Sequence, residues 1–553
     1  MSFFEECVLS ANKFLKTVCF IDDQPVFNKS EDPANEEIDH RLYADVITKA
    51  FAPQGKFCAF YHYQRKEEEE QLLELAKSSD INVLDWRIIL TEEARPVLVE
   101  DIIEEKEVII EDRLDSDESE EDVEEKESRG RYALSIIEKI LRHNFPSPKV
   151  ILIFTAEYDA ESIFNPIQAK LEALGILFTS NADELWFQND RFKISIYFKD
   201  SIKNNYISQS VKNKIIAFEN FPEIVNHEFA SLITGLVLKT AIDSVSEVRA
   251  NTFSLLESYN KKLDPAFLSH KALLPDPTDA EEHLLEVIGS DIKAILKGSS
   301  IIDNFRKTCL PQYLEEKYKN EEYVFDIPER EKFPSLQTTN TISNQVLKSI
   351  VINGIEKTFY GKDQSFEEQL IFAKNCHKEL TKTFTIGEDL NFAHKSDIQF
   401  SILTTIKPKY QINKFILTQG TIVKEDSNDS YWLCIQPKCD SVRITTKKRA
   451  FTFLRIYKAD VNSFQLVLNP EVPIYLKIDY KVYSSKSFDF AVDEGVVSSV
   501  IENDKIKFKR WDNKYMLWIA ELKNDYAQSV SNNYSVGLSR VGLDLSEWLR
   551  RSS

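Results

Sequence analysis

Five polar residues follow directly on short apolar runs in the first 200 residues, and their types suit phosphoryl chemistry. The runs TVCFI, INVL, KVILIF and KISIYF lead into Asp22 and Asp23, Asp85, Thr155 and Lys199, respectively. If these runs are neighbouring parallel strands, their carboxyl ends meet at one edge of a sheet, where open sheets of this kind bind ligands. We therefore expect three carboxylates, one hydroxyl and one ammonium group to lie together.

The carboxylates of Asp22, Asp23 and Asp85 suit a hard divalent cation such as Mg²⁺, which prefers carboxylate oxygens. A phosphoryl group on Asp85 would have its negative charge covered by that cation, by Thr155 and by Lys199. Phosphoryl transfer requires positioning and electrostatic stabilisation of this kind. Each residue taken alone is more often structural, as a cap or a surface lysine, so the prediction depends on the five occurring in this order.

The apolar runs lack polar alternation, which is typical of strands buried on both faces of a parallel sheet. They lie at 17–21, 57–60, 81–84, 149–154 and 193–198. Helix-like stretches occur between them, at 67–79, 132–144 and 160–175, and Pro166 indicates either a kink or a later start of the last one. Alternating strands and helices predict βαβ units and a doubly wound, flavodoxin-like sheet.

Composition divides the 553 residues into four regions, which predict a multidomain α/β + β protein. Residues 1–205 carry the strand–helix pattern, with an acidic insertion at about 96–130. Residues 206–330 are helical in pattern, and 331–395 form a mixed linker region. Residues 396–553 are rich in aromatic and β-branched runs, which predicts a barrel or sandwich that ends in two short helices.

Charge is distributed unevenly along the chain. The formal net charge is −21, but residues 401–553 hold 23 Lys and Arg against 17 Asp and Glu, a net of +6, so the first 400 residues carry −27. Residues 100–127 alone contain 16 acidic residues, which predicts a solvated loop, with a regulatory or binding segment as the alternative. The negative net charge disfavours a chain-wide surface for nucleic acid or anionic membranes, because the protein would repel both.

Several features predict a cytoplasmic protein. No apolar run approaches the ~18 residues of a membrane span, and the first residues, MSFFEEC, carry glutamates where a signal peptide needs positive charge. The seven cysteines are odd in number and scattered, which indicates reduced thiols. Cys434 and Cys439 have no partners at a zinc-site spacing, so two buried thiols are favoured over a metal site.

No motif for a catalytic effector occurs in the sequence. GxxxxGK[ST], GxGxxG, HExxH and GxSxG are all missing, as is a kinase ATP-binding signature. We therefore expect a phosphoacceptor that is not an enzyme beyond slow loss of its own phosphoryl group.

The strand-end pattern over residues 1–205 resembles the receiver domain of two-component response regulators. The resemblance implies that Asp22 and Asp23 hold Mg²⁺ together with Asp85, and that Asp85 accepts a phosphoryl group from a histidine kinase. It also implies that Thr155 is the switch hydroxyl and that Lys199 contacts the phosphoryl group.

More closely, the chain is similar to the divergent response receiver proteins of bacterial phage-defence operons, including the Detocs-type phosphorelays. The stretches DPAFLSHKALLPDPTDAEE, YWLCIQPKCDSVR and LSRVGLDLSEWLR contribute to this similarity. It implies a sensor histidine kinase and a receiver-bearing effector as partners, with this chain as a phosphate reservoir or adaptor.

The sequence also departs from the receiver pattern. WRIILTEEARP replaces the usual Pro-Gly turn after the acceptor, Asp200 follows Lys199 where proline is usual, and Ile196 occupies the aromatic switch position. Trp86 either shields the acceptor or simply packs. The alternative hypothesis is therefore a scaffold or nucleic-acid-binding protein with a vestigial receiver, in which the β-rich region stacks on bases.

Overall fold

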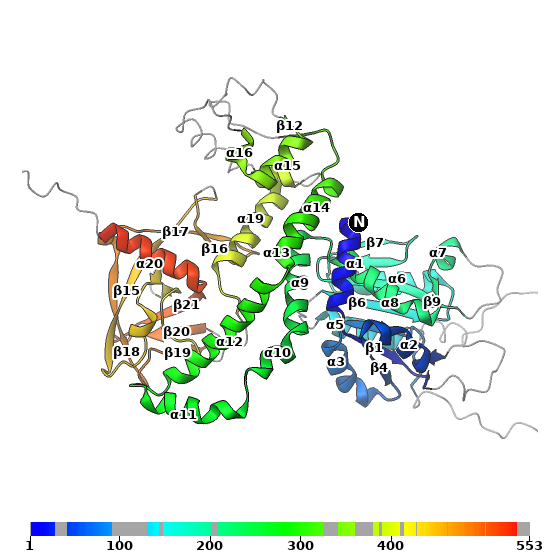
Figure 1. The fold of residues 1–553 in the computed structure, drawn as a ribbon, viewed down its shortest axis with the longest axis horizontal. Helices are drawn as coiled ribbons and strands as arrows, with labels where there is room; N and C mark the ends of the chain where they lie inside the picture. Colours follow the sequence, from blue (N-terminus) through cyan, green and yellow to red (C-terminus); the bar gives the residue numbers. More distant parts are fainter. Residues whose placement is uncertain are drawn as a thin grey trace, which may run out of the picture. The chain divides into compact units, whose positions relative to one another are not determined.

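The computed structural model describes most of the chain, in residues 2–27, 41–90, 130–142, 148–200, 208–324, 341–359, 380–385, 390–409, 414–426, 429–461, 463–503 and 505–538. The predicted acidic insertion, up to residue 129, and the second predicted terminal helix lie outside these residues. The described residues form two compact units, Met1–Tyr318 and Lys319–Ser553. Figure 1 colours the chain along its sequence.

The first unit is built on an eight-stranded sheet in which six strands run parallel, namely the two-residue β10 (Ile215–Ile216) and five longer strands. In spatial order they are β4 (Phe57–His62), β1 (Thr17–Asp22), β5 (Ile81–Leu84), β6 (Lys149–Thr155) and β9 (Phe192–Lys199). Numbered along the chain, this order is 2-1-3-4-5, the order of a doubly wound flavodoxin-like sheet. The predicted parallel α/β sheet is therefore confirmed.

Burial on both faces holds for β1, β5, β6 and β9, but the prediction is wrong for β4. The side chains of β4 are partly or fully exposed, and Phe57 is 74% exposed. The reason is position, because β4 lies at the edge of the sheet and is covered less completely than the inner strands.

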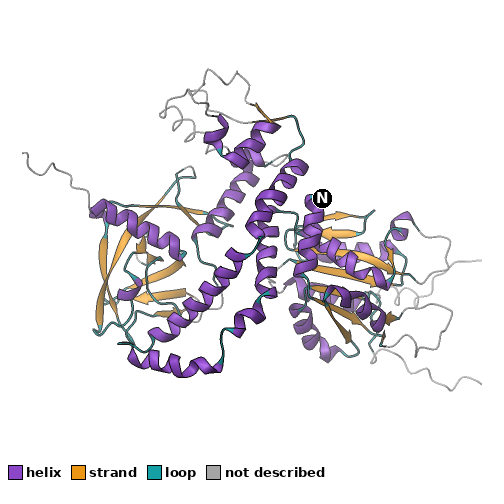
Figure 2. Ribbon diagram, in the orientation of Figure 1, coloured by secondary structure: helices purple, strands orange, loops and turns teal. Residues whose placement is uncertain are grey.

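Alternate residues of the inner strands enter two separate cores, one on each face of the sheet. Cys19 and Ile21 pack with three helices, α3 (Glu69–Ser78), α5 (Arg131–Arg142) and α6 (Ala160–Ala173). Val18 and Phe20 pack on the other face with α1 (Phe3–Phe14), α2 (Ala44–Phe51) and α8 (Phe221–Leu232). Figure 2 shows the strands of this unit between helices. The strand period of two thus produces three layers.

The helix α6 starts where its capping residue lies. The Asp159 carboxylate accepts a hydrogen bond from Ser162 N, and the helix continues through Pro166 to Ala173. The alternative of a later start at Pro166 is therefore wrong.

Three short strands that the sequence did not predict extend the sheet beyond β9, two of them paired directly with it. The hairpin of β7 (Thr179–Asn181) and β8 (Trp186–Gln188) pairs antiparallel with the first half of β9. β10 (Ile215–Ile216) pairs parallel with its last two residues. Strands of two or three residues are too short to show a period, so only the folded chain reveals them.

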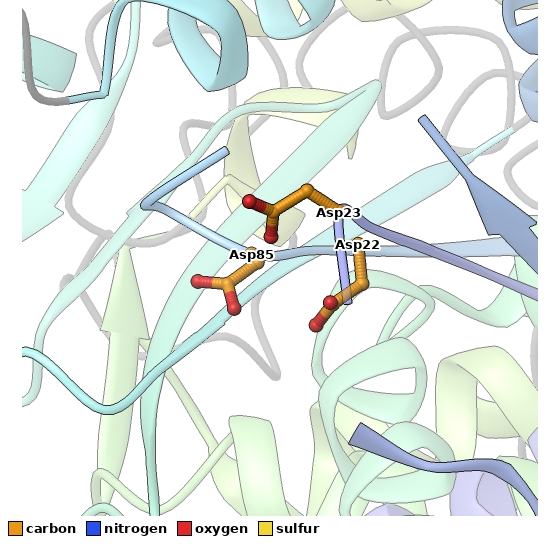
Figure 3. Close-up of side chains that lie close together, drawn as sticks. All are labelled: Asp22, Asp23 and Asp85. Atoms are coloured by element: carbon orange, nitrogen blue, oxygen red, sulfur yellow. The ribbon is translucent and has the colours of Figure 1, made fainter. Parts of the chain in front are cut away.

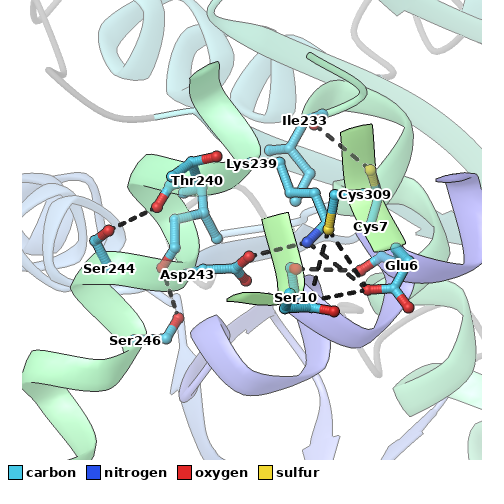
Figure 4. Close-up of polar contacts among 12 residues, drawn as sticks. Glu6, Cys7, Ser10, Ile233, Lys239, Thr240, Asp243, Ser244, Ser246 and Cys309 are labelled. Atoms are coloured by element: carbon cyan, nitrogen blue, oxygen red, sulfur yellow. Dashed lines mark hydrogen bonds and ion pairs between the residues drawn. The ribbon is translucent and has the colours of Figure 1, made fainter. Parts of the chain in front are cut away.

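The amino-terminal helix α1 belongs to the core of this unit. A capping box begins it, since Ser2 Oγ accepts from Glu5 N and the Glu5 carboxylate accepts from Ser2 N. Lys239 of α9 (Leu236–Ala250) is buried beside it, with Nζ 2.9 Å from Asp243 and 4.0 Å from Glu6 of α1. Figure 4 shows this cluster together with Cys309. Because an unpaired buried charge is costly, Asp243 stabilises Lys239 within α9, and the contact with Glu6 joins α9 to α1.

The remaining elements of the first unit are mostly helical. They are α7 (Gln209–Lys212), α10 (Thr252–Glu257), α11 (Asp264–Leu273), α12 (Asp279–Gly298), α13 (Ile301–Asn304) and α14 (Leu310–Lys317), with a short parallel pair of β2 (Pro25–Val26) and β3 (Leu42–Tyr43). The predicted helical pattern of the middle region is seen in these segments.

The described residues of the second unit contain a mainly antiparallel nine-stranded sheet. Its strands are β13 (Thr421–Glu425), β14 (Tyr431–Cys434), β15 (Lys448–Lys458), β16 (Leu466–Leu468), β17 (Ile474–Ile478), β18 (Lys486–Ala491), β19 (Ser499–Glu502), β20 (Lys505–Lys509) and β21 (Tyr515–Glu521). Further elements are β11 (Glu322–Val324), β12 (Thr341–Ser343), α15 (Asn344–Asn353), α16 (Ile355–Phe359), α18 (Leu380–Phe384), α19 (Leu390–Thr405) and α20 (Asn524–Leu538).

Six of these strands close into a barrel around aromatic side chains. The ring runs β15, β14, β13, β21, β20 and β18, and it closes where Trp511 N donates to Asp489 O and Arg510 bridges to Phe490. Phe451, Phe453, Phe488 and Phe490 fill its interior with other apolar residues. The predicted β-rich carboxyl-terminal region is therefore confirmed.

The pair Cys434 and Cys439 is only half as predicted. Cys434 lies buried in the aromatic interior, but Cys439 is exposed, because it sits in a turn of 3₁₀ helix after β14. Among the described residues, no helix is long and apolar enough to cross a membrane.

Candidate functional site

Three aspartates meet at the carboxyl edge of the parallel sheet. Asp22 is the last residue of β1, Asp23 follows it, and Asp85 follows β5, the neighbouring strand. One carboxylate oxygen from each residue lies within 4.8 Å of the others. Figure 3 shows the three side chains from their adjacent strand ends. Parallel pairing of β1 with β5 therefore brings together carboxylates that lie 62 to 63 positions apart in the sequence.

Backbone amides hold one oxygen of each carboxylate. Asp22 Oδ1 accepts from Gln24 N at 2.6 Å, and Asp85 Oδ1 accepts from Arg87 N at 3.1 Å. Asp23 Oδ2 accepts from Ile89 N at 2.9 Å. The loop after Asp85 thus reaches back to Asp23, so that residues 85–90 and the first acidic pair form one hydrogen-bonded structure.

Lys199 supplies the positive charge of the site. It ends β9 and is 1% exposed. Its Nζ lies 2.7 Å from Asp85 Oδ2 and 3.5 Å from Asp22 Oδ2. A buried ammonium is stable only when it is paired, and these two carboxylates pair with it.

The electrostatics of the site follow from burial and from these pairs. Burial raises the pKa of Asp22 to about 7, although Lys199 opposes the shift. Burial likewise raises the pKa of Asp23, although the amide of Ile89 opposes this. Burial alone would lower the pKa of Lys199, but Asp85 and Asp22 outweigh it and raise that pKa above its usual value. The ammonium therefore keeps its proton, and Asp22 exchanges one near neutral pH.

The donor set of this cluster fits Mg²⁺. Three carboxylates offer hard oxygen ligands, and Mg²⁺ in proteins is usually held by one or two carboxylates together with waters and phosphate oxygens. A cation there would share Asp22 and Asp85 with Lys199, so the two positive charges would compete for the same oxygens.

Thr155 lies at the same edge, at the end of β6, which is flanked by β5 and β9. It is 1% exposed, and its Oγ1 accepts a hydrogen bond from Glu157 N at 3.1 Å. The hydroxyl hydrogen remains a donor toward another acceptor. All five predicted residues thus end or directly follow parallel strands of one sheet. Lys199 contacts Asp22 and Asp85, Asp23 lies beside these two carboxylates, and Thr155 ends the strand between β5 and β9.

Trp86, directly after Asp85, packs as a core residue. Its side chain is 1% exposed and lies against Gly130, where an added Cβ would come within 2.2 Å of the ring. Gly130 has φ +77°, a left-handed conformation that glycine adopts readily. Trp86 therefore packs in the core against Gly130, just before α5, and shielding of a phosphoryl group by its ring stays a prediction.

Sequence reasoning missed two contributors to this site. The Ile89 amide holds Asp23, and the Tyr158 hydroxyl donates to the carbonyl of Lys199 at 2.5 Å. A backbone amide has no sequence signal. Tyr158 lies three residues after Thr155, but the sequence does not show that the loop after β6 approaches the end of β9.

The comparisons with known proteins agree with this geometry for part of the chain. Residues 14–204, under half of the chain, match the family model described as a response receiver domain. No curated protein and no solved structure matches the chain. The chain therefore contains a response receiver domain, which implies a phosphoacceptor function of the response-regulator kind.

Proposed function

We propose that the receiver domain accepts a phosphoryl group on Asp85 from a phosphohistidine of a partner histidine kinase. The single observation that carries the proposal is the contact of 2.7 Å between Lys199 Nζ and Asp85 Oδ2, inside a cluster with Asp22 and Asp23. A structural ion pair needs one acid for one base. Two buried acids and the half-buried Asp23 near one lysine leave negative charge that a cation would compensate.

The transfer step uses the Asp85 carboxylate as the nucleophile. One carboxylate oxygen attacks phosphorus, a P–O bond forms as the P–N bond of phosphohistidine breaks, and the imidazole nitrogen that leaves takes up a proton. The Lys199 ammonium moves from pairing with the carboxylate to pairing with the phosphoryl oxygens. The Thr155 hydroxyl donates to one of these oxygens. These contacts hold charge that develops in the transition state, as phosphoryl transfer requires.

Asp22, Asp23 and Asp85 would hold Mg²⁺, which when bound would supply further positive charge for the phosphoryl oxygens. The chain's own residues then have separate tasks. Asp85 forms the bond, Lys199 and Thr155 orient the group, and buried Trp86 and Ile88 line the apolar side of the loop. Loss of the group by hydrolysis would be slow where water is excluded.

We further propose that the chain acts in a bacterial phage-defence phosphorelay, as a phosphate reservoir or adaptor and not as an enzyme. The sequence similarity to defence-operon receiver proteins supports this, whereas the response receiver match supports only the receiver domain. The partners would be a sensor histidine kinase and a receiver-bearing effector. The sequence contains no catalytic effector motif, which favours an adaptor over a toxin.

The test is phosphorylation of the full chain by phosphoramidate, a small donor with a P–N bond, in Mg²⁺. Intact mass spectrometry should show one added phosphoryl group in the wild type and none in Asp85→Asn. The matched control is Asp190→Asn, because Asp190 is exposed and precedes the other end of β9. It should be labelled like the wild type.

Beryllofluoride, a phosphoryl mimic, gives a second measurement. With Mg²⁺ it should raise the melting temperature of the wild type and of Asp190→Asn, but not of Asp85→Asn. If the folded wild type neither takes up phosphate nor responds to beryllofluoride, the proposal is wrong. The domain would then be vestigial, as in the scaffold or nucleic-acid-binding alternative.

A further inference from the structure

Tyr158 connects the loop that carries Thr155 to the residue that carries the positive charge of the site. It lies in the segment between Thr155 and α6, and its hydroxyl donates to the backbone carbonyl of Lys199 at 2.5 Å. Its ring stacks on Phe198, with centroids 5.6 Å apart and planes at 25°. One side chain therefore holds two of the strand ends, β6 and β9, in a fixed relation.

The position that is usually aromatic in receivers, three residues before the lysine, cannot join the Thr155 loop to β9 in this chain. Ile196, three residues before Lys199, is aliphatic and fully buried in the core beneath α6. The neighbouring Tyr197 faces the opposite side of the sheet, where its hydroxyl donates to Glu228. Tyr158 is thus the aromatic side chain that directly joins the Thr155 loop to the end of β9.

We infer that Tyr158 is a positioning residue for the phosphorylated state, which it favours by holding the Thr155 loop against Lys199. The inference rests on the proposed function of Asp85. The path between the two residues is short. Thr155 Oγ1 accepts from Glu157 N, and Tyr158 is the next residue, so a shift of the phenol is transmitted to the hydroxyl within three residues.

The Tyr158 hydroxyl matters because the carbonyl that accepts its hydrogen bond belongs to Lys199. Lys199 is the last residue of β9, and its Nζ must leave Asp85 Oδ2 for the phosphoryl oxygens when Asp85 is phosphorylated. With the main chain of Lys199 held by β10 and by Tyr158, only the side chain has to move. Removing the phenolic hydroxyl frees both the loop and this carbonyl.

Tyr158→Phe removes the hydroxyl and keeps the ring stack, so it isolates the hydrogen bond. A single hydrogen bond of ordinary strength corresponds to about a two- to tenfold change in an equilibrium constant. We expect Tyr158→Phe to bind beryllofluoride, in Mg²⁺, about two- to tenfold more weakly than the wild type. Its affinity for Mg²⁺ alone should be unchanged, because Tyr158 contacts none of the three carboxylates in the described structure.

The matched control is Tyr61→Phe. Tyr61 is also partly buried and also donates its hydroxyl to a backbone carbonyl, that of Glu68 at 3.2 Å, but it lies on edge strand β4. This variant should bind beryllofluoride like the wild type, whatever it does to the melting temperature. A purely structural role for Tyr158 would make the two variants alike.

A double-mutant cycle that combines Tyr158→Phe with Thr155→Ala decides whether Tyr158 acts through the hydroxyl of Thr155. We expect the effect of Tyr158→Phe on beryllofluoride affinity to become small when Thr155 is alanine. The inference is overturned if Tyr158→Phe binds like the wild type, if Tyr61→Phe loses as much, or if the loss is equally large without Thr155. If the wild type itself does not respond, the proposed function fails and this inference fails with it.

Discussion

Replacing Lys199 by methionine tests whether the three carboxylates need a cation. At an effective dielectric constant of about 20, unit charges at the observed 2.7 and 3.5 Å attract by about 6 and 5 kcal/mol. Like charges no more than 4.8 Å apart repel by at least about 3.5 kcal/mol per pair, or roughly 10 kcal/mol for three ionised carboxylates. Attraction and repulsion nearly balance, and Lys199→Met removes the attraction.

The observable loss is smaller than these gross terms, because the carboxylates respond by taking up protons or water. Breaking a buried pair by removing one partner typically costs about 3–5 kcal/mol, which we expect for Lys199→Met in EDTA at pH about 8. Mg²⁺ should restore most of this loss, because a divalent cation can replace the ammonium among the same oxygens. The variant should also bind Mg²⁺ at least about tenfold more tightly than the wild type, since a competing charge is gone.

The assay is thermal and urea unfolding of full-length variants in EDTA and in Mg²⁺, with Mg²⁺ titration by calorimetry. Lys193→Met is the matched control: Lys193 lies on the same strand, is buried, and pairs with Glu228 at 2.6 Å. It should be destabilised in both solutions alike. The reasoning is refuted if Lys199→Met loses no stability in EDTA, or if Mg²⁺ restores Lys193→Met to the same extent.

Three further predictions concern the same region. Asp85→Asn should weaken Mg²⁺ binding by about tenfold or more, because one charged ligand is lost, whereas Asp190→Asn should leave the calorimetric affinity unchanged. Because burial raises the pKa of Asp22 to about 7, protons compete with Mg²⁺, so the affinity should rise as the pH increases toward 7 and then level off. Without metal the effect of pH is opposite. The folded state keeps the Asp22 proton up to a pH of about 7, whereas the unfolded state releases it near pH 3.8, so the contribution of Asp22 to stability should fall as the pH rises from 3.8 to about 7. An Asp22→Asn variant should not show this fall. Gly130→Ala should lower stability by about 2–4 kcal/mol through collision with the Trp86 ring, while Gly175→Ala, also at positive φ but with nothing within 4 Å, should cost only about 1 kcal/mol; equal melting temperatures would contradict the packing described for Trp86.

The sequence predicted the parts of this molecule that depend on local pattern and on one topological rule. Buried runs such as INVL indicated strands, and parallel pairing then predicted that Asp22, Asp23, Asp85 and Lys199 would meet, as they do in the structure. The roles of these residues in phosphoryl transfer remain predictions. The exposure of Phe57 could not be predicted, because the identity of the edge strand is a property of the whole sheet.

Contacts between distant segments account for the rest. Gly130 directly precedes α5, and its need to be glycine comes from Trp86, which follows the distant strand β5. Cys434 ends the apolar run YWLC and lies in a strand, whereas Cys439 lies between Lys438 and Asp440 in a turn. The contact of Tyr158 with the end of β9 could not be predicted, because in the sequence Tyr158 is only a loop residue after β6.

The cover of the sheet determines the order in which this unit can fold. One face is closed by α1 and α8, and Phe3 N donates to Glu316 across 313 positions of the chain. A ribosome that has synthesised residues 1–204 has made the five longer parallel strands but not α8, so apolar residues such as Phe154 still lack their partner Phe221. Contacts this far apart in sequence form late and slowly. Nascent chains therefore expose part of this sheet face until α8 has been synthesised, and chaperones would act during that interval.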